Sequence, residues 1–244
     1  HFHYGYFLYA ASIMAAYDST FVSHYGAEVD LLAADIANPS TSENFPATRV
    51  YDPYAGHSWA AGLAPFADGN NQESSSEAVH AWNGVALWAE ATGNTTLGET
   101  GKALLANETY SARTQWRAAD IDGYTKPLVV LNWGGKRDYA TFFSDEPSVK
   151  LGIQLIPLDP SMAASFKDET RLSDKLLSGS ITGDNFNVTL GDYDLMYLAL
   201  TNPDKAYRLA QTQQDSFIDD GNSHILADVS ADRPDVFAWL AFFH

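Results

Sequence analysis

The sequence predicts an all-α protein made of helical hairpins. Three observations favour this fold class: helical patterns dominate, short loops join them in pairs, and only one short segment reads as a strand. The chain has 244 residues, of which 45% are apolar, so it can bury a substantial core. Because no linker-like tract separates two halves, we expect one domain over residues 1–244, with a toroid of hairpins as one form.

The first part of the chain is predicted to hold two helices followed by a long loop. Tyr4–Gly26 is apolar almost all round and ends on glycine, which is typical of a buried helix. Ala27–Pro39 reads as a shorter helix that ends where proline follows asparagine. Ser40–Asn71 is rich in Gly, Pro, Asp and Asn, and loops this long inside a compact domain are usually functional or disordered.

The rest of the chain alternates helices with short connections. Glu73–Gly93 is predicted as a helix because its large apolar residues fall roughly on one face and Gly93 suits its end. Leu97–Arg117 is a second helix, and Pro127–Trp133 is a short strand or buried extended segment. Four later segments also carry helical patterns: Ser161–Glu169, Thr170–Gly179, Asp192–Asn202 and Pro203–Gln213.

Composition narrows the classes of partner. The net charge of −17 argues against nucleic acid and anionic membranes, and no apolar run is long enough to span a bilayer. The absence of cysteine excludes disulfides and thiolate chemistry. Aromatic residues reach 13% and aromatic faces grip flat apolar surfaces such as sugar rings, so a neutral substrate fits this chain well.

One stretch, "GHSWAAGLAPFADGNNQESSSEA" (Gly56–Ala78), concentrates polar chemistry. Glu73 and Glu77 are four residues apart, which would place both on one face in the first turns of the expected helix. Asn70-x-x-Glu73 and Ser74-x-x-Glu77 also fit capping boxes, so helix capping is one interpretation of these acids. The other interpretation is a sugar site, because an aromatic side chain, several amides and a turn lie beside the two carboxylates.

Other motifs give weaker signals. His1-x-His3 could share a metal only on an extended segment, so we expect no metal or other cofactor. Ser58 lies in a loose likeness of a nucleophile elbow, but the G-x-S-x-G spacing and the preceding strand are missing. Three glycosylation sequons occur, at Asn94, Asn107 and Asn187, and they are compatible with secretion.

Four blocks together resemble glycoside hydrolase family 81, whose members are endo-β-1,3-glucanases. They are "HFHYGYFLYAA" (1–11), the Gly56–Ala78 stretch, "WGGKRDYATFF" (133–143) and "GIQLIP" (152–157), and they occur in the family's order. The resemblance implies an (α/α)6 toroid as catalytic domain, normally preceded by a β-sandwich domain and a connecting domain. It also implies inverting hydrolysis without a metal, acting outside the cell or at the cell wall. We expect a monomer.

The resemblance assigns roles to particular residues. Glu73 takes the place of the general base and Glu77 that of a supporting acid. The family's general acid is an aspartate just upstream of the first block, so we expect it before His1, and nothing favours Asp52 or Asp68 in its place. The residues expected to line the sugar subsites are His3, Tyr4, Tyr6, His57, Trp59, Asp68, Asn70, Gln72, Trp133, Lys136 and Tyr139. For the aromatic ones, plain core packing is the alternative.

Two other functions compete with glucan hydrolysis. A non-catalytic β-glucan-binding protein would use the same aromatic and amide groups without needing an acid. A polysaccharide lyase on a helical toroid would need cations for its uronate substrate, which suits poorly a chain with 14 Lys and Arg against 31 Asp and Glu.

Overall fold

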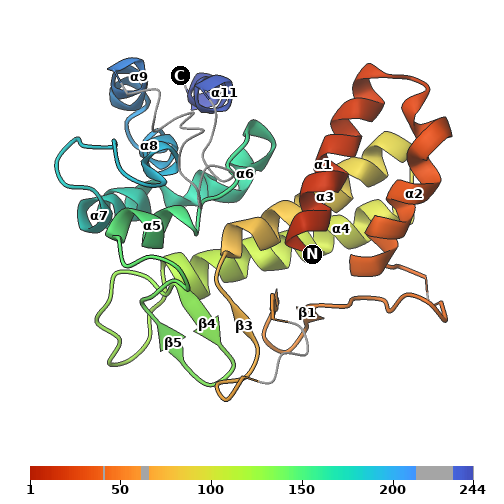
Figure 1. Ribbon diagram of the computed structural model, residues 1–244, viewed down its shortest axis with the longest axis horizontal. Coiled ribbons are helices and arrows are strands. Elements are labelled where there is room, and N and C mark those ends of the chain that lie inside the picture. Colours follow the sequence, from red (N-terminus) through yellow and green to blue (C-terminus); the bar gives the residue numbers. More distant parts are fainter. Residues whose placement is uncertain (41, 62–65, 213–232, 244) are drawn as a thin grey trace. The chain divides into compact units, whose positions relative to one another are not determined.

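The computed structural model describes residues 1–40, 42–61, 66–212 and 233–243 (Figure 1). Most of these residues are helical, which confirms the predicted all-α class. Contacts divide the chain into two compact units: the first comprises His1–Gln72 and Glu77–Ala112, and the second comprises Glu73–Ser76 and Arg113–His244. The expectation of a single domain stays a prediction.

The first unit is built mainly from four helices, and three short extended segments lie between the second and third (Figure 1). Its core is formed by Leu8, Ile36, Trp82, Val85 and Trp88, which are almost completely buried. Strands β1 and β2 pair antiparallel, with Asp52 opposite His57. The elements are α1 (Phe2–Tyr17), α2 (Phe21–Ile36), β1 (Tyr51–Asp52), β2 (His57–Ser58), β3 (Asn71–Gln72), α3 (Ser75–Thr92) and α4 (Thr95–Ser111).

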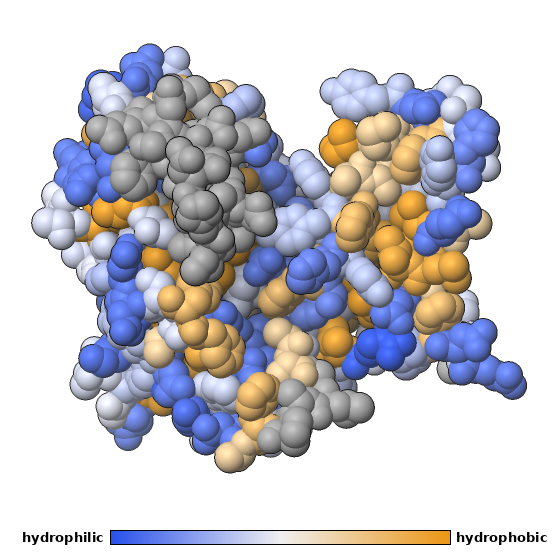
Figure 2. Space-filling model, in the orientation of Figure 1, coloured by the Kyte–Doolittle hydropathy of each residue, from blue (hydrophilic) through white to orange (hydrophobic). Residues whose placement is uncertain are grey.

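The predicted single buried helix over Tyr4–Gly26 is wrong, because α1 ends at Tyr17 and α2 begins at Phe21. Asp18 turns the chain there: its Oδ1 accepts hydrogen bonds from the backbone N–H of Thr20 at 2.8 Å and from its hydroxyl at 2.7 Å. The helix is also not buried all round. Phe7 and Tyr17 are 62% and 87% exposed, and Figure 2 shows apolar residues at the surface in the region of α1.

Two glycines allow the backbones of α1 and α3 to approach closely. A Cβ on Gly5 would lie 2.5 Å from Ala81 Cα, and one on Gly84 would lie 2.7 Å from the carbonyl oxygen of Gly5. Neither position has room for a side chain. This contact brings the start of α1 beside α3, where the His1 ring stacks on Trp82 with ring centroids 5.4 Å apart.

Apart from Glu73–Ser76, the second unit begins at Arg113, within a π-helical turn, η1 (Ala112–Arg117), that continues α4. The predicted extended segment contains β4 (Leu131–Trp133), which pairs antiparallel with β5 (Arg137–Asp138). Short helices follow: α5 (Pro147–Gly152), η2 (Pro160–Met162), α6 (Ala163–Phe166), η3 (Lys167–Glu169), α7 (Thr170–Ser180), α8 (Gly191–Leu198), α9 (Pro203–Thr212) and α11 (Arg233–Phe243).

The core of the second unit gathers large side chains from α6, α8 and α11. Phe166 packs edge-on against Tyr197 and Trp239, with ring centroids 6.4 and 6.3 Å apart. The indole N–H of Trp239 donates to the carbonyl oxygen of Met196 at 2.7 Å, so the buried ring has no unsatisfied donor. The four predicted helical segments all contain helix, but α5 and α11 were not predicted, and Gln213 lies outside the described residues. No helix in the described ranges could cross a membrane.

Candidate functional site

Glu73 lies between β3 and α3, in the second unit, and is half-buried. Its Oε1 accepts a hydrogen bond from the backbone N–H of Phe142 at 2.9 Å, and its own carbonyl oxygen accepts one from Gln154 Nε2 at 2.7 Å. Because α3 begins only at Ser75, Glu73 precedes the helix. The expectation that Glu73 and Glu77 share a face in its first turns is therefore wrong.

The β4–β5 hairpin carries a cluster near the residue that holds Glu73. The ring of Phe142 packs edge-on against Trp133, with centroids 5.9 Å apart. The Trp133 indole N–H donates to Asp138 Oδ2 at 3.0 Å, and Lys136 Nζ lies 5.2 Å from the Trp133 ring and 3.1 Å from the same carboxylate. The structure thus brings two predicted site residues, Trp133 and Lys136, together, although Trp133 is only 7% exposed.

Tyr139 is the third predicted residue of this hairpin region. It is half-buried, and two lysines lie near its ring: Lys150 Nζ is 4.9 Å and Lys126 Nζ is 5.7 Å from the centroid. Burial raises the pKa of Tyr139 above its ordinary value, so its hydroxyl is neutral at physiological pH and can both donate and accept hydrogen bonds.

Glu77 is the third residue of α3 and lies in the first unit. Its Oε1 accepts a hydrogen bond from the Tyr6 hydroxyl at 3.0 Å, and the Tyr6 ring packs 5.0 Å from the ring of His80. His3 is exposed one turn earlier on α1, so His3 and Tyr6 are neighbours on that helix. The structure therefore brings Tyr6 directly onto the second predicted acid.

His57 and Gln72 were predicted to line a sugar subsite, but they lie beneath the surface. They are 1% and 0% exposed. Gln72 uses its amide inside the protein: its Nε2 donates to Glu108 Oε1 at 2.9 Å and its Oε1 accepts from the Ser58 hydroxyl at 3.2 Å. Side chains so placed support the loops of the site, and direct contact with a sugar is not available to them.

Glu108 on α4 organises these loops, and nothing in the sequence around it predicts this role. Its fully buried carboxylate accepts hydrogen bonds from the Ser58 backbone N–H at 2.9 Å, from Gln72 at 2.9 Å and from the Trp82 indole at 3.0 Å. One acid thus ties together β2, β3 and α3. The contacts join residues that are 26 to 50 positions apart in the chain, so no local sequence pattern predicts them.

We expect Glu108 to make the stability of the protein fall as pH rises. Burial raises the pKa of Glu108 from 4.5 to about 7, and hydrogen bonds from Trp82, Gln72 and Ser58 only partly offset this rise. Between these values the unfolded chain ionises first, so the contribution of Glu108 to stability is fully present below about pH 4.5 and decreases until about pH 7, by on the order of 3 kcal/mol. Urea unfolding of the full-length protein at pH 5 and pH 7.5 measures the change.

The matched variant for that measurement is Glu108→Gln, whose neutral amide resembles the protonated acid at every pH. All other carboxyl groups titrate equally in both proteins, so the difference between the two pH profiles isolates Glu108. The wild type should lose more stability than the variant over this interval. Parallel profiles would show that Glu108 does not titrate there.

Trp59 and Asn70 line a cavity of about 780 Å³ in the first unit, together with Arg49, Tyr51 and Asp52. The Trp59 indole N–H donates to Asp52 Oδ2 at 3.0 Å. A cavity with two aromatic side chains and amide and charged groups at its wall has the composition of a sugar-binding site. Asp68, half-buried, lies close to Asn70 in the chain but is not among the lining residues.

Asp52 does not suit the role of a general acid. The hydrogen bond from Trp59 is the largest of the causes that lower its pKa, and the backbone N–H groups of Ala55 and Tyr54 act in the same direction. Its carboxylate is therefore ionised at neutral pH and stabilises the turn between β1 and β2. An acid catalyst has to be protonated instead.

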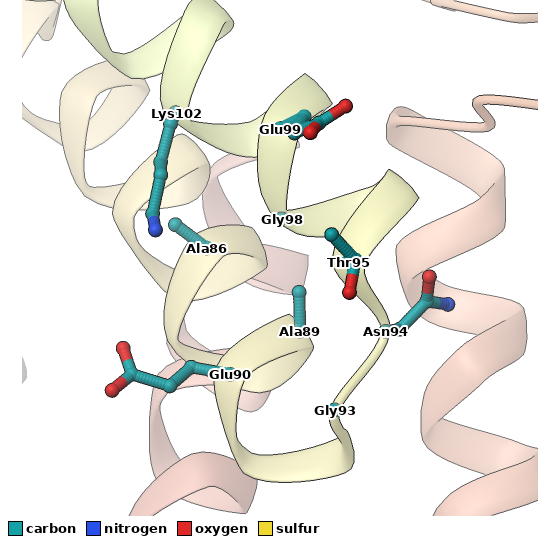
Figure 3. Close-up of a pocket in the computed structure, with 9 residues that line it drawn as sticks. All are labelled: Ala86, Ala89, Glu90, Gly93, Asn94, Thr95, Gly98, Glu99 and Lys102. Atoms are coloured by element: carbon teal, nitrogen blue, oxygen red, sulfur yellow. The ribbon is translucent and has the colours of Figure 1, made fainter.

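A second depression, of about 320 Å³, lies at the turn between α3 and α4 (Figure 3). Glu90, Glu99 and Lys102 are among its lining residues, and none of the residues that line it is aromatic. Asn94, one of the three sequon residues, lies at this turn, where its Oδ1 accepts from the backbone N–H of Leu97 at 3.1 Å and caps α4. None of the predicted site residues lies here. Within the described ranges, no group of three or more side chains is arranged to hold a metal ion.

Comparison with known proteins identifies the family. The model of the glycosyl hydrolase family 81 C-terminal domain matches residues 1–227. A glucan endo-1,3-beta-D-glucosidase from Acetivibrio thermocellus is 39% identical over 213 residues, which are 83% of this chain and 27% of that protein. A protein of the same name from Glycine max is 35% identical over 179 residues, covering 69% of this chain and 27% of that protein.

A more distant relative and a solved structure agree with these matches. The primary septum glucan endo-1,3-beta-D-glucosidase of Schizosaccharomyces pombe is 28% identical over 91% of this chain and 23% of its own length. A family 81 glycoside hydrolase from Clostridium thermocellum, solved as a glutamate-to-alanine mutant, is 31% identical with a TM-score of 0.80, over 99% of this chain and 33% of that one. This chain spans about a quarter of the length of the curated relatives it matches. It belongs to glycosyl hydrolase family 81, as part of the C-terminal domain.

Proposed function

We propose that the protein containing this chain hydrolyses internal β-1,3-glucosidic bonds of β-1,3-glucan. The names of the relatives support the reaction and the substrate. One relative is named for the primary septum, which supports action at the cell wall or outside the cell. The aromatic and polar lining of the cavity at Trp59 suits a neutral sugar chain, and a protein with a net charge of −17 has no general attraction for anionic polymers.

The observation that carries the proposal is the environment of Glu73. Its half-buried carboxylate is oriented by one backbone N–H, that of Phe142, and its backbone is held by Gln154. A backbone N–H donor stabilises the ionised form of a carboxylate, which is the form that a general base needs. In the proposed mechanism Glu73 takes a proton from water while that water attacks the anomeric carbon.

Glu77 has a supporting role in this proposal. The Tyr6 hydroxyl donates to Glu77 Oε1 at 3.0 Å, so this carboxylate already has a fixed protein partner. The leaving oxygen needs a proton from a second carboxyl group on the opposite face of the sugar ring, about 6.5–9.5 Å from the base in an inverting enzyme. We assign that role to the aspartate expected upstream of His1, following the resemblance to the family.

The full-length protein is expected to release oligosaccharides from a linear β-1,3-glucan and to leave β-1,4-glucan intact. NMR of the first products should show the α-anomer, because single displacement by water inverts the β configuration. A non-catalytic binding protein would retain β-1,3-glucan without releasing sugar. Equal release from cellulose would contradict the proposed substrate, and β-anomeric first products would contradict the mechanism alone.

A further inference from the structure

Gln154, which follows α5, has every hydrogen-bonding position of its buried amide occupied. Its Nε2 donates to the carbonyl oxygens of Glu73 at 2.7 Å and Val130 at 3.2 Å. Its Oε1 accepts from the hydroxyl of Ser75 at 2.8 Å and from the Ser75 backbone N–H at 3.3 Å. An amide offers two hydrogens and two lone pairs, and all four are used here. Three of these bonds go to the segment that carries Glu73.

The buried ion pair of Arg117 and Glu169 adds further hydrogen bonds to Gln154 and Ser75. Arg117 Nη1 donates to the backbone carbonyl oxygen of Gln154 and to the Ser75 hydroxyl, each at 3.3 Å. The guanidinium is gripped in turn by Glu169, with nitrogen–oxygen distances of 2.7 to 3.1 Å, and both side chains are at most 1% exposed. The Tyr197 hydroxyl also donates to Glu169, at 2.7 Å.

The segment 73–76 depends on such long-range contacts for its place. It belongs to the second unit, although the residues on both sides of it in the chain belong to the first. Gln154 is about 80 residues away in sequence and provides bonds both to the residue carrying the acid and to the first residue of α3. A shift of these two peptide groups would move the Glu73 side chain away from the Phe142 N–H that orients it.

We propose that Gln154 is a positioning residue for the hydrolysis, because it fixes the backbone of Glu73 and so the direction of the Glu73 carboxylate. This inference rests on the role proposed for Glu73. A misplacement of about 1 Å can lower turnover about 100-fold, while the affinity for a long substrate depends on other contacts. Loss of Gln154 should therefore lower kcat far more than it raises KM.

Gln154→Met in the full-length protein tests this, since methionine has a similar length but no amide. We expect kcat on β-1,3-glucan to fall about 10- to 100-fold, with KM changed less than about threefold. Hydrogen exchange of a peptide covering residues 73–76 should become faster. The control is Tyr197→Phe, which removes a buried hydrogen bond of the same network without touching residues 73–75. It should change stability but neither kcat nor this exchange.

Ser75→Ala is a milder variant, because the Ser75 backbone N–H still donates to Gln154 Oε1, and it should fold even if Gln154→Met does not. It removes the hydroxyl bond to Gln154 Oε1 and the bond that the hydroxyl accepts from Arg117, and we expect kcat to fall about 2- to 10-fold. The proposal is overturned if Gln154→Met and Ser75→Ala, or whichever of the two folds, have a kcat no lower than that of Tyr197→Phe. A wild-type protein that does not cleave β-1,3-glucan would contradict the proposed function instead, and the exchange measurement would still report whether Gln154 holds the segment.

Discussion

Glu73→Gln in the full-length protein is expected to lower turnover of β-1,3-glucan about 10³-fold. The amide has the shape of the carboxylate and can keep the hydrogen bond from the Phe142 N–H, so the site should stay intact. It cannot accept the proton of the attacking water, and loss of a general base costs about 10²–10⁴-fold. Steady-state kinetics should show the loss in kcat, with little change in KM.

Glu77→Gln is the matched control, because it makes the same chemical change four residues away. Its remaining carbonyl oxygen can still accept from the Tyr6 hydroxyl, so we expect a loss smaller than 10²-fold. Azide should restore turnover in Glu73→Ala, where the space left by the side chain admits a small nucleophile. If Glu77→Gln abolishes activity while Glu73→Gln keeps most of it, the two roles are reversed.

The helices of this protein could be predicted from local sequence patterns. The residues at which some of them begin and end could not. Glu73–Gly93 was predicted as a helix, and α3 covers Ser75–Thr92. The predicted start is two residues too early, so Glu73 lies before the helix and not in its first turn. The break between α1 and α2 has a local signal, because Asp18 accepts hydrogen bonds from Thr20 there. The apolar residues on both sides favoured one continuous helix instead.

The candidate site shows the same division between local and long-range information. The family resemblance pointed to Glu73, Trp133 and Lys136, and the last two do lie together. The resemblance could not tell a surface side chain from a supporting one, so His57 and Gln72 were predicted as sugar contacts although they are buried. Glu108 and Gln154 were missed because their partners lie 24 to 81 residues away in the chain.

Glu169→Ala is expected to destabilise the protein by about 3–5 kcal/mol, because it leaves the Arg117 guanidinium buried without a counter-charge. The Tyr197 hydroxyl loses its acceptor in the same variant. Such a change corresponds to a fall in the unfolding temperature of roughly 6–20 °C. Thermal unfolding of the full-length protein followed by circular dichroism or calorimetry measures it.

The matched control is Asp35→Ala, which breaks the ion pair with Arg49 at the surface of the first unit. The side chains of that pair are 47% and 27% exposed, and exposed pairs contribute about 0–1 kcal/mol. The destabilisation should therefore be several-fold smaller than that of Glu169→Ala. Equal effects of the two substitutions would show that the charge of Arg117 finds water or another partner when Glu169 is removed.

A double variant, Arg117→Met with Glu169→Leu, separates stability from positioning. Replacing a buried ion pair by apolar side chains of similar volume is often neutral or stabilising, so most of the 3–5 kcal/mol lost in Glu169→Ala should return. The hydrogen bonds from Arg117 to Gln154 and Ser75 do not return, because methionine has no donor. We therefore expect a protein with nearly normal unfolding temperature but lowered kcat. If the unfolding temperature and kcat of the double variant are both close to those of the wild type, the ion pair only stabilises the core. A residue that positions Glu73 could not be replaced by one that merely fills its space.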